Sequence, residues 1–298
     1  MIRLLLSALL LLPCAIAASG EELPPGYFLL LPESVSDVFV AETDAATLRH
    51  YRNVDGKVVV VADYYMSIGQ HGVGKQRPWD RRTPLGIYFL NDELDTSKLH
   101  PRYGVKAFPL DYPNSWDRLK ERSGDGIWLH GVDPDGGKRP PRDTDGCLAL
   151  PNDDLLRIAA DIVPLKTPII VTRGLNKVAA AELAKTRAEL KDALQQWAAY
   201  YSDADMFAYF ELYAEEFTYR GLSRDEWMAF RMQTSATRIL DELLIEELYL
   251  LADPEEPGLY LSRFTQTLLE GERRVTTTKR LYWKRLDGRF QIVAEDNG

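Results

Sequence analysis

An abrupt change of sequence pattern near residue 175 divides this chain into two parts that must fold differently. Before it, short runs of β-branched and aromatic residues, such as Lys57 to Val61, alternate with loops rich in glycine, proline and aspartate. From Leu175 to Tyr201 the strongest helix formers dominate, with apolar residues three and four positions apart. The pattern predicts a mostly β domain with long loops over residues 24–174, a helical linker over 175–186 and a second domain over 187–298.

The second part opens with helical patterns and ends with strands. Helices are predicted over residues 207–217 and 224–232, and the second of these begins with Ser223 as N-cap and Glu226 three positions later, a capping box. Asp287-Gly288 favours a hairpin turn near the end of the chain. This order predicts an α+β domain. Its strands are predicted at residues 259–264, 275–283 and 289–293.

Residues 1–17 have the pattern of a cleavable export signal. Arg3 precedes an apolar run, and Ala15 and Ala17 supply small residues at the spacing that signal peptidase accepts. Pro13 and Cys14 break the run too early for a membrane span, which needs about 20 apolar residues. We therefore expect export and no stable membrane span, with lipidation of Cys14 as an alternative for which the preceding residues are a poor context.

Charge and cysteine content narrow the classes of function. With 36 basic and 45 acidic residues the chain is acidic, which argues against nucleic acid as a partner. Loss of Cys14 with the signal would leave Cys147 as the only cysteine, in a compartment where paired cysteines oxidise. Two interpretations of this lone thiol stay open at this point, a buried small apolar residue or a nucleophile.

A cysteine nucleophile needs a base and donors for the oxyanion that forms on the attacked carbonyl. His130 is the best candidate base, because it ends an apolar strand just before Gly131, where a rigid element can aim its ring into a cleft. Cys147 follows 17 positions later, and the preceding Gly146 lets the backbone turn sharply. The other histidines are His50 in a predicted strand, His71 in a glycine-rich loop and His100 before a proline.

Two separated motifs carry a resemblance to a known family. One is His130-Gly131 followed by Thr144-Asp145-Gly146-Cys147, and the other is Gly74-Lys75, Asp80, Thr83-Pro84 and Gly86-Ile87-Tyr88. Together they resemble the catalytic domain of the L,D-transpeptidases, the YkuD-like family, which pairs a His-Gly strand with a Ser/Thr-x-Gly-Cys turn. The resemblance covers residues 37–173 and implies a YkuD-like β-sandwich with long loops.

The resemblance implies a cysteine enzyme of the periplasm that modifies peptidoglycan. Cys147 would attack the carbonyl between the third stem-peptide residue, a diamino acid, and a terminal D-alanine. His130 would act as base, with its ring oriented by the carbonyl of Gly131. The amides of Gly146 and Cys147, with Asp145 as a further candidate, would form the oxyanion hole. The acyl group would pass to an amine acceptor, of a second stem peptide or a lipoprotein, or to water.

Two positions depart from the family's pattern. Asp145 stands where a histidine is common, and Ala149 stands where an arginine is common. A carboxylate beside the thiol opposes formation of the thiolate by like charge, unless it points toward a cation such as Arg142 or a substrate amine. These departures leave the acyl acceptor less determined than the nucleophile.

The substrate-binding residues are expected on the loop before the cysteine and on nearby strands. A stem peptide ends in a carboxylate, which a guanidinium can hold with two hydrogen bonds, and we expect Arg142 in that role. Thr144 and Tyr88 complete the predicted set. The alternatives are an exposed cationic surface for the loop at residues 138–142, and a place in the core for Tyr88 and for Trp128, both of which could instead line the cleft.

The order of elements in residues 187–298, with aromatic residues in the first helices, resembles the NTF2-like fold, a cone of curved sheet wrapped by helices. Cell-shape-determining L,D-carboxypeptidases have a similar domain layout. Family frequency makes crosslinking the first expectation, and the layout makes trimming of tetrapeptides to tripeptides the alternative. A third hypothesis is an inactive cell-wall-binding scaffold. No cofactor or metal is expected, since a single thiol cannot build a cysteine-rich zinc site.

Overall fold

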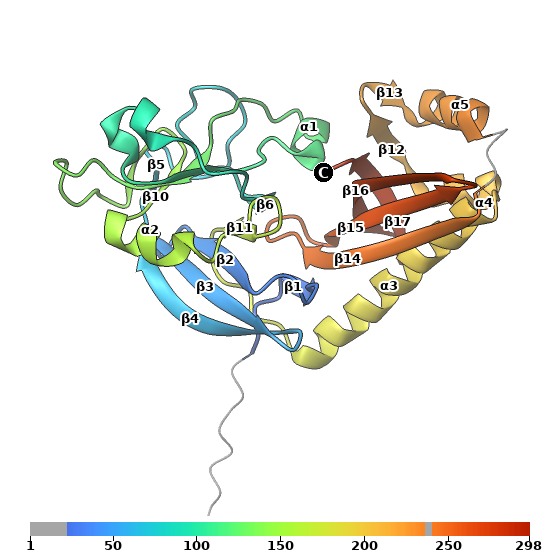
Figure 1. Cartoon of the computed structure of the whole chain (residues 1–298), viewed down its shortest axis with the longest axis horizontal. Coiled ribbons are helices and arrows are strands. Elements are labelled where there is room, and N and C mark those ends of the chain that lie inside the picture. The colour runs from blue at the N-terminus through green and yellow to red at the C-terminus, as the bar shows by residue number, and fades with distance from the viewer. Residues whose placement is uncertain (1–22, 236–239) are drawn as a thin grey trace, which may run out of the picture.

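The computed structural model describes residues 23–235 and 240–298, so the predicted export signal and Cys14 lie outside the described residues. The elements stack in four layers: a three-stranded sheet, a five-stranded sheet, a seven-stranded sheet and a layer of helices (Figure 1). None of the described helices combines the length and the apolar composition that crossing a bilayer requires.

The first domain is a sandwich of two sheets, and its strands are short because long loops interrupt them. In the five-stranded sheet only the pair β2 and β11 is parallel. Its order is β4 (Lys57–Tyr65), β3 (Thr47–Val54), β2 (Asp37–Glu42), β11 (Pro168–Thr172) and β6 (Gly86–Phe89). The facing sheet has the order β10 (Leu148–Ala149), β8 (Trp128–His130) and β7 (Ala107–Pro109), and β5 (Ile68–Gly69) pairs with β9 (Arg142–Thr144). The helices are α1 (Ser115–Leu119) and α2 (Asn152–Ala159), with 3₁₀ turns at Thr96–Lys98 and Pro101–Tyr103.

Strand β2 is apolar without alternation because the five-stranded sheet is covered on both faces. Phe39 points into the core between the two sheets of the first domain, where it joins Leu129 of β8 and Leu155 of α2. Its neighbours Val38 and Val40 point to the opposite face, toward the second domain. This double burial makes the five-stranded sheet the centre of the molecule.

The second domain is a curved sheet whose concave face is filled by aromatic side chains from three helices. Trp197 of α3 and Trp227 of α5 lie in one core with Trp283 of the sheet. Figure 1 shows α3 running along the sheet. The strand order is β1 (Phe28–Leu30), β14 (Glu242–Ala252), β15 (Leu259–Glu270), β16 (Arg273–Leu286), β17 (Arg289–Asp296), β12 (Tyr213–Tyr219) and β13 (Leu222–Ser223). The helices are α3 (Ala180–Ser202), α4 (Met206–Glu211) and α5 (Arg224–Ser235).

The two domains share a continuous interface. Leu251 and Leu261 of the large sheet pack in one apolar cluster with Val40 and Ile170 of the five-stranded sheet. Strand β1 comes from the start of the described chain, yet it pairs with β14 in the sheet of the second domain. Apolar packing joins the two domains directly. The domain boundaries drawn from the sequence stay a proposal.

The predicted fold class, a mostly β first domain followed by an α+β domain, is confirmed. The capping box of Ser223 and Glu226 is confirmed as well. The helix predicted over residues 207–217 is wrong in its second half, because α4 ends at Glu211 and the chain continues as a strand whose aromatic side chains enter the core. Strand β14 was not predicted, and its register shifts beside Glu247, which has a positive φ of 51°.

Candidate active site

A cavity of about 570 Å³ opens on the first domain and receives both His130 and Cys147. Its walls come from four loops and from the end of β8, so residues far apart in the sequence meet around it. Polar and charged side chains make up most of the lining. The lining residues are Gln70, Lys75, Pro78, Trp79, Arg102, Tyr103, Gly124, Asp125, Gly126, Trp128, His130, Arg139, Asp143, Thr144, Asp145 and Cys147.

His130 is the last residue of β8, and its ring is held from two sides. Nδ1 lies 2.6 Å from the carbonyl oxygen of Gly131, which can only accept, so Nδ1 carries the proton and Nε2 keeps its lone pair. The ring of Tyr103 meets the imidazole edge-on, with 5.2 Å between ring centroids. Burial lowers the pKa of His130 to about 4, although the bond to Gly131 opposes this shift. The imidazole is therefore a neutral base at neutral pH.

Parallel pairing of β10 with β8 brings Cys147 beside the histidine strand, because Leu148 is in register with Leu129. The thiol donates a hydrogen bond to the carbonyl oxygen of Gly126 at 3.4 Å. Burial raises the pKa of the thiol to about 11, although the backbone N–H of Trp128 opposes this shift. Thiol and imidazole are thus both neutral in the resting site, and proton transfer must accompany attack by sulfur.

The turn before Cys147 depends on a hydroxyl and a glycine. Thr144 donates from Oγ1 to the carbonyl of Cys147 at 2.7 Å and accepts from the N–H of Gly146 at 3.1 Å. Gly146 has a φ of 127°, and a Cβ there would lie 2.7 Å from the carbonyl oxygen of Arg82. Because Thr144 occupies the N–H of Gly146, that amide is not available to an oxyanion, contrary to the sequence-based prediction. The amides of Cys147 and Asp145 remain candidates.

Asn152, the first residue of α2, fixes the loop that follows His130. Its Oδ1 accepts from the N–H of Val132 at 3.0 Å, and its Nδ2 donates to the carbonyl of the same residue at 2.9 Å. A Cβ at Gly131 would lie 2.2 Å from Asn152 Oδ1. Only a glycine lets this amide approach the backbone whose carbonyl orients His130.

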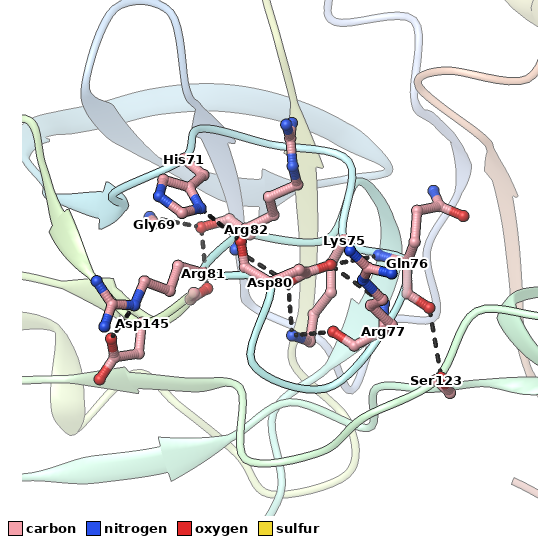
Figure 2. Close-up of polar contacts among 12 residues, drawn as sticks. Gly69, His71, Lys75, Gln76, Arg77, Asp80, Arg81, Arg82, Ser123 and Asp145 are labelled. Carbon is pink, nitrogen blue, oxygen red and sulfur yellow. Dashed lines mark hydrogen bonds and ion pairs between the residues drawn. The ribbon is translucent and has the colours of Figure 1, made fainter.

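Asp145 forms ion pairs with two arginines at the mouth of the cavity. Its carboxylate lies 3.7 Å from Nε of Arg81 and 3.8 Å from Nη1 of Arg102, and Figure 2 shows the contact with Arg81. The side chain is half-exposed, so solvent and these cations weaken its repulsion of the thiolate. The position that departs from the family's pattern thereby becomes a bridge between two loops.

Asp80 organises the glycine-rich loop of residues 70–82 (Figure 2). Its carboxylate accepts from the backbone N–H groups of Gln76, Arg77 and Arg82 at 2.7 to 3.1 Å, and from Nζ of the buried Lys75 at 3.0 Å. Burial acts to raise the pKa of Asp80, but these bonds lower it to about 2. The loop is therefore held firmly in place at neutral pH.

The structure brings together some of the predicted site residues and not others. Thr144 lines the cavity but is occupied in holding the turn. Arg142 lies on β9, exposed and outside the cavity lining. Tyr88 is fully buried and donates to the carbonyl of Leu85 at 3.1 Å. It therefore belongs to the core, whereas the substrate-binding role predicted for it would require a place in the cavity lining.

Several lining residues were missed by the sequence analysis. Arg102 and Tyr103 arrive on the 3₁₀ turn after His100, and nothing in their local sequence marks them. Arg139 belongs to the cationic loop that the sequence did single out, and it lines the cavity, whereas Arg142 does not. Its side chain is mostly buried and lies near Asp143.

Within residues 23–235 and 240–298, one group of side chains has the spacing of a metal site. Asp37, His50 and Asp161 offer ligand atoms that lie within 4.8 Å of one another. However, Asp37 Oδ1 lies 2.7 Å from Nε2 of His50 and also accepts from the guanidinium of Arg52 at 3.1 Å. Because the guanidinium of Arg52 already pairs with the carboxylate of Asp37, an ion-pair cluster accounts for the close approach of these side chains.

Comparison with protein families confirms the resemblance drawn from the two motifs. Residues 37–171 match the L,D-transpeptidase catalytic domain of the YkuD family, and residues 189–296 match the Cds6 C-terminal NTF2-like domain. A comparison with curated proteins gave no match.

Solved structures are similar to this chain over both domains. Bd1075 from Bdellovibrio bacteriovorus is 24% identical with a TM-score of 0.76, over 92% of this chain and 98% of that one. The helical cell shape determining protein Pgp2 from Campylobacter jejuni is 24% identical with a TM-score of 0.75, over 90% of this chain and 94% of that one. At this identity the likeness concerns the fold. The chain therefore carries a YkuD L,D-transpeptidase catalytic domain followed by a Cds6 C-terminal NTF2-like domain.

Proposed function

We propose that this protein is a periplasmic L,D-carboxypeptidase that trims stem tetrapeptides to tripeptides through an acyl-enzyme on Cys147. The observation that carries the proposal is the meeting of His130 and Cys147 in one cavity, with the imidazole proton fixed on Nδ1. A neutral base and a neutral thiol need no preformed ion pair, since the base takes the thiol proton as sulfur attacks. The YkuD catalytic domain supports peptidoglycan as the substrate.

Two arginines suit the carboxylate of the terminal D-alanine. Arg102 and Arg139 both line the cavity that holds Cys147, and they approach it from different loops. The carbonyl of Arg102 accepts from Nη2 of Arg139 at 3.4 Å, which ties the two loops together. A guanidinium binds a carboxylate with two parallel hydrogen bonds. We assign these residues the role that the sequence analysis gave to Arg142.

The proposed reaction has two halves. Sulfur attacks the carbonyl of the diamino acid, the C–N bond to D-alanine breaks, and His130 passes the thiol proton to the departing amine. The resulting thioester is then attacked by water, whose proton goes to His130 and on to the leaving sulfur. The backbone amides of Cys147 and Asp145 would stabilise the oxyanion in both halves.

Water is favoured over an amine as acceptor because two of the three aspartates that could receive a second cationic group are already paired with arginines. Of the three aspartates in the lining, Asp143 lies 3.7 Å from Arg139 and Asp145 is paired with Arg81 and Arg102. The solved structure from Campylobacter jejuni with the same two-domain layout is a cell shape determinant. This reverses the order of preference that family frequency alone suggested.

The test is mass spectrometry of disaccharide-tetrapeptide incubated with the protein lacking residues 1–17, beside a Cys147→Ala control. We expect disaccharide-tripeptide and free D-alanine in equal amounts, no dimers, and no reaction with the control. Dimers joined between two diamino acids would instead establish transpeptidation. If wild-type protein and control both leave the substrate intact, the chain is a scaffold and the proposal fails.

A further inference from the structure

Trp79 is the most exposed large apolar residue among those described, and it stands at the mouth of the catalytic cavity. Its side chain is 91% exposed, although it lines the same cavity as Cys147. By contrast, Trp116, Trp197 and Trp227 are buried. An indole ring held in water at the mouth of an active site is available to contact a ligand.

The backbone at Trp79 has a conformation that residues other than glycine rarely adopt. Trp79 has a φ of 63° and Arg81 a φ of 57°, both in the left-handed region, which is unfavourable for bulky residues. Asp80 lies between them and accepts four hydrogen bonds from the loop and from Lys75. Because the surrounding contacts enforce this conformation, the ring is presented on a rigid support.

The cavity wall beside the ring is formed by Pro78, Gly124 and Asp125, with Lys75 behind them. Pro78 is adjacent, and Gly124 lies against it with a φ of 101°, so that a Cβ there would stand 3.4 Å from Pro78 Cα. Lys75 also lines this wall, but its Nζ is occupied by Asp80 and by the carbonyl of Arg77. The carboxylate of Asp125 at the edge offers an acceptor for hydroxyl or amide donors.

We propose that Trp79, Pro78, Gly124 and Asp125 form a saccharide subsite that holds the amino sugar to which the stem peptide is attached. A pyranose ring has an apolar C–H face for the indole and donor groups for the carboxylate, and it carries no charge that this wall would have to neutralise. Three residues of extended peptide span on the order of 10 Å, so the sugar lies near the cavity mouth when the scissile bond reaches Cys147. This inference rests on the proposed function and adds the preferred form of its substrate.

The experiment compares kcat/KM for disaccharide-tetrapeptide and for the free tetrapeptide of the same sequence. Wild-type protein should prefer the disaccharide form by about tenfold, from burial of part of the indole ring. Trp79→Ala should reduce that ratio to about 1, and Trp79→Phe should keep part of it. Phe207→Ala removes another exposed aromatic side chain, 84% exposed on α4 of the second domain, and should leave the ratio unchanged.

Binding to Cys147→Ala protein, measured by calorimetry, provides a readout without turnover. The disaccharide-tetrapeptide should bind about tenfold more tightly than the free peptide, and Trp79→Ala in the same background should abolish the difference. Equal values for both substrates in wild-type protein, or a ratio that survives Trp79→Ala, overturn the saccharide subsite while leaving the carboxypeptidase intact. If neither substrate releases D-alanine but the disaccharide-tetrapeptide still binds more tightly than the free peptide, the proposed function fails and the saccharide subsite stands.

Discussion

Thr83 donates a hydrogen bond from Oγ1 to the carbonyl oxygen of Gly146, 63 positions later in the chain, at 2.9 Å. The same hydroxyl accepts from the backbone N–H of Gly69 at 2.9 Å. One buried side chain at the end of the glycine-rich loop therefore ties β5 to the turn that presents Cys147. This relationship gives the upstream Thr-Pro motif a physical role in the site.

We expect Thr83→Val to destabilise the protein by about 2 to 4 kcal/mol, because the isosteric side chain leaves a buried N–H and a buried carbonyl without partners. The turn at Gly146 should also lose its fixed position, so acylation of Cys147 should slow. Urea unfolding and the rate of D-alanine release measure the two effects. Thr83→Ser keeps the hydroxyl and serves as control; a loss of stability in Thr83→Ser with none in Thr83→Val would mean that the methyl group, and not the hydrogen bonds, matters.

The protonation states of the resting site predict how the thiol reacts with an alkylating agent. Since burial raises the pKa of Cys147 to about 11, the thiolate fraction should grow about tenfold per pH unit from pH 7 to pH 10. We expect the iodoacetamide rate constant of substrate-free protein to rise over this whole range. A rate that is already high and constant between pH 5 and pH 8 would reveal a preformed thiolate–imidazolium pair and contradict the neutral site.

The buried imidazole makes stability depend on pH below neutrality. Burial lowers the folded-state pKa of His130 to about 4, below the unfolded value of about 6.5. The unfolded chain therefore binds the proton more readily, so stability is fully present above pH 6.5 and falls as the pH drops toward 4. The contribution lost at pH 5 is about 2 kcal/mol. His130→Gln should lose less stability than wild type between pH 7.5 and pH 5 in urea titrations, whereas parallel losses would contradict the shifted pKa.

The elements with a strong local pattern were predictable from the sequence, and those set by long-range packing were not. The strands predicted at residues 259–264, 275–283 and 289–293 are found as β15, β16 and β17, because β-type residues and the turn at Asp287-Gly288 mark them locally. The residues after Glu211 were predicted as helix because Phe217 continues a helical spacing, but that ring packs against Trp227 in the sheet core. Local spacing cannot show which partner a side chain will meet.

The same division applies to the candidate site. His130 and Cys147 could be found because their chemistry leaves a short motif around each of them. Arg102 could not, since its role depends on the loop of residues 100–104 reaching the cavity, which follows from tertiary structure alone. Asp145 looked unfavourable from its neighbours in the sequence, and only the structure shows Arg81 and Arg102 beside it.

The two arginines of the cavity should affect substrate binding more than the chemistry of Cys147. Arg102→Ala and Arg139→Ala should each raise KM for the tetrapeptide by about 10- to 100-fold, the loss of charge-assisted hydrogen bonds to a carboxylate. A tetrapeptide amidated at its C-terminus should be a poor substrate for wild type. Its KM should change little in Arg102→Ala and Arg139→Ala, because it has no carboxylate for these arginines to bind. Arg157→Ala, on the exposed side of α2, is the matched control. A larger effect of Arg142→Ala would restore the sequence-based prediction.

The ion pair between Asp111 and Arg280 should couple the stability of the two domains. Arg280 of β16 donates from Nη1 to Asp111 and from Nε to Asp296, and all three side chains are largely buried. Burial raises the pKa of Asp111 against the opposing effect of Arg280. Asp111→Ala should therefore cost about 3 kcal/mol, because it leaves a buried guanidinium with one partner in place of two.

A double-mutant cycle with Arg280→Met separates the pair from its surroundings. We expect a coupling energy of about 1 to 3 kcal/mol and a single urea transition in wild-type protein, since the apolar interface and this pair both join the domains. The exposed pair of Asp95 and Lys98 is the control, and Lys98→Ala should have no measurable effect on unfolding. Additive losses for Asp111→Ala and Arg280→Met would mean that each side chain acts within its own domain, so that the interface is held by apolar contacts alone.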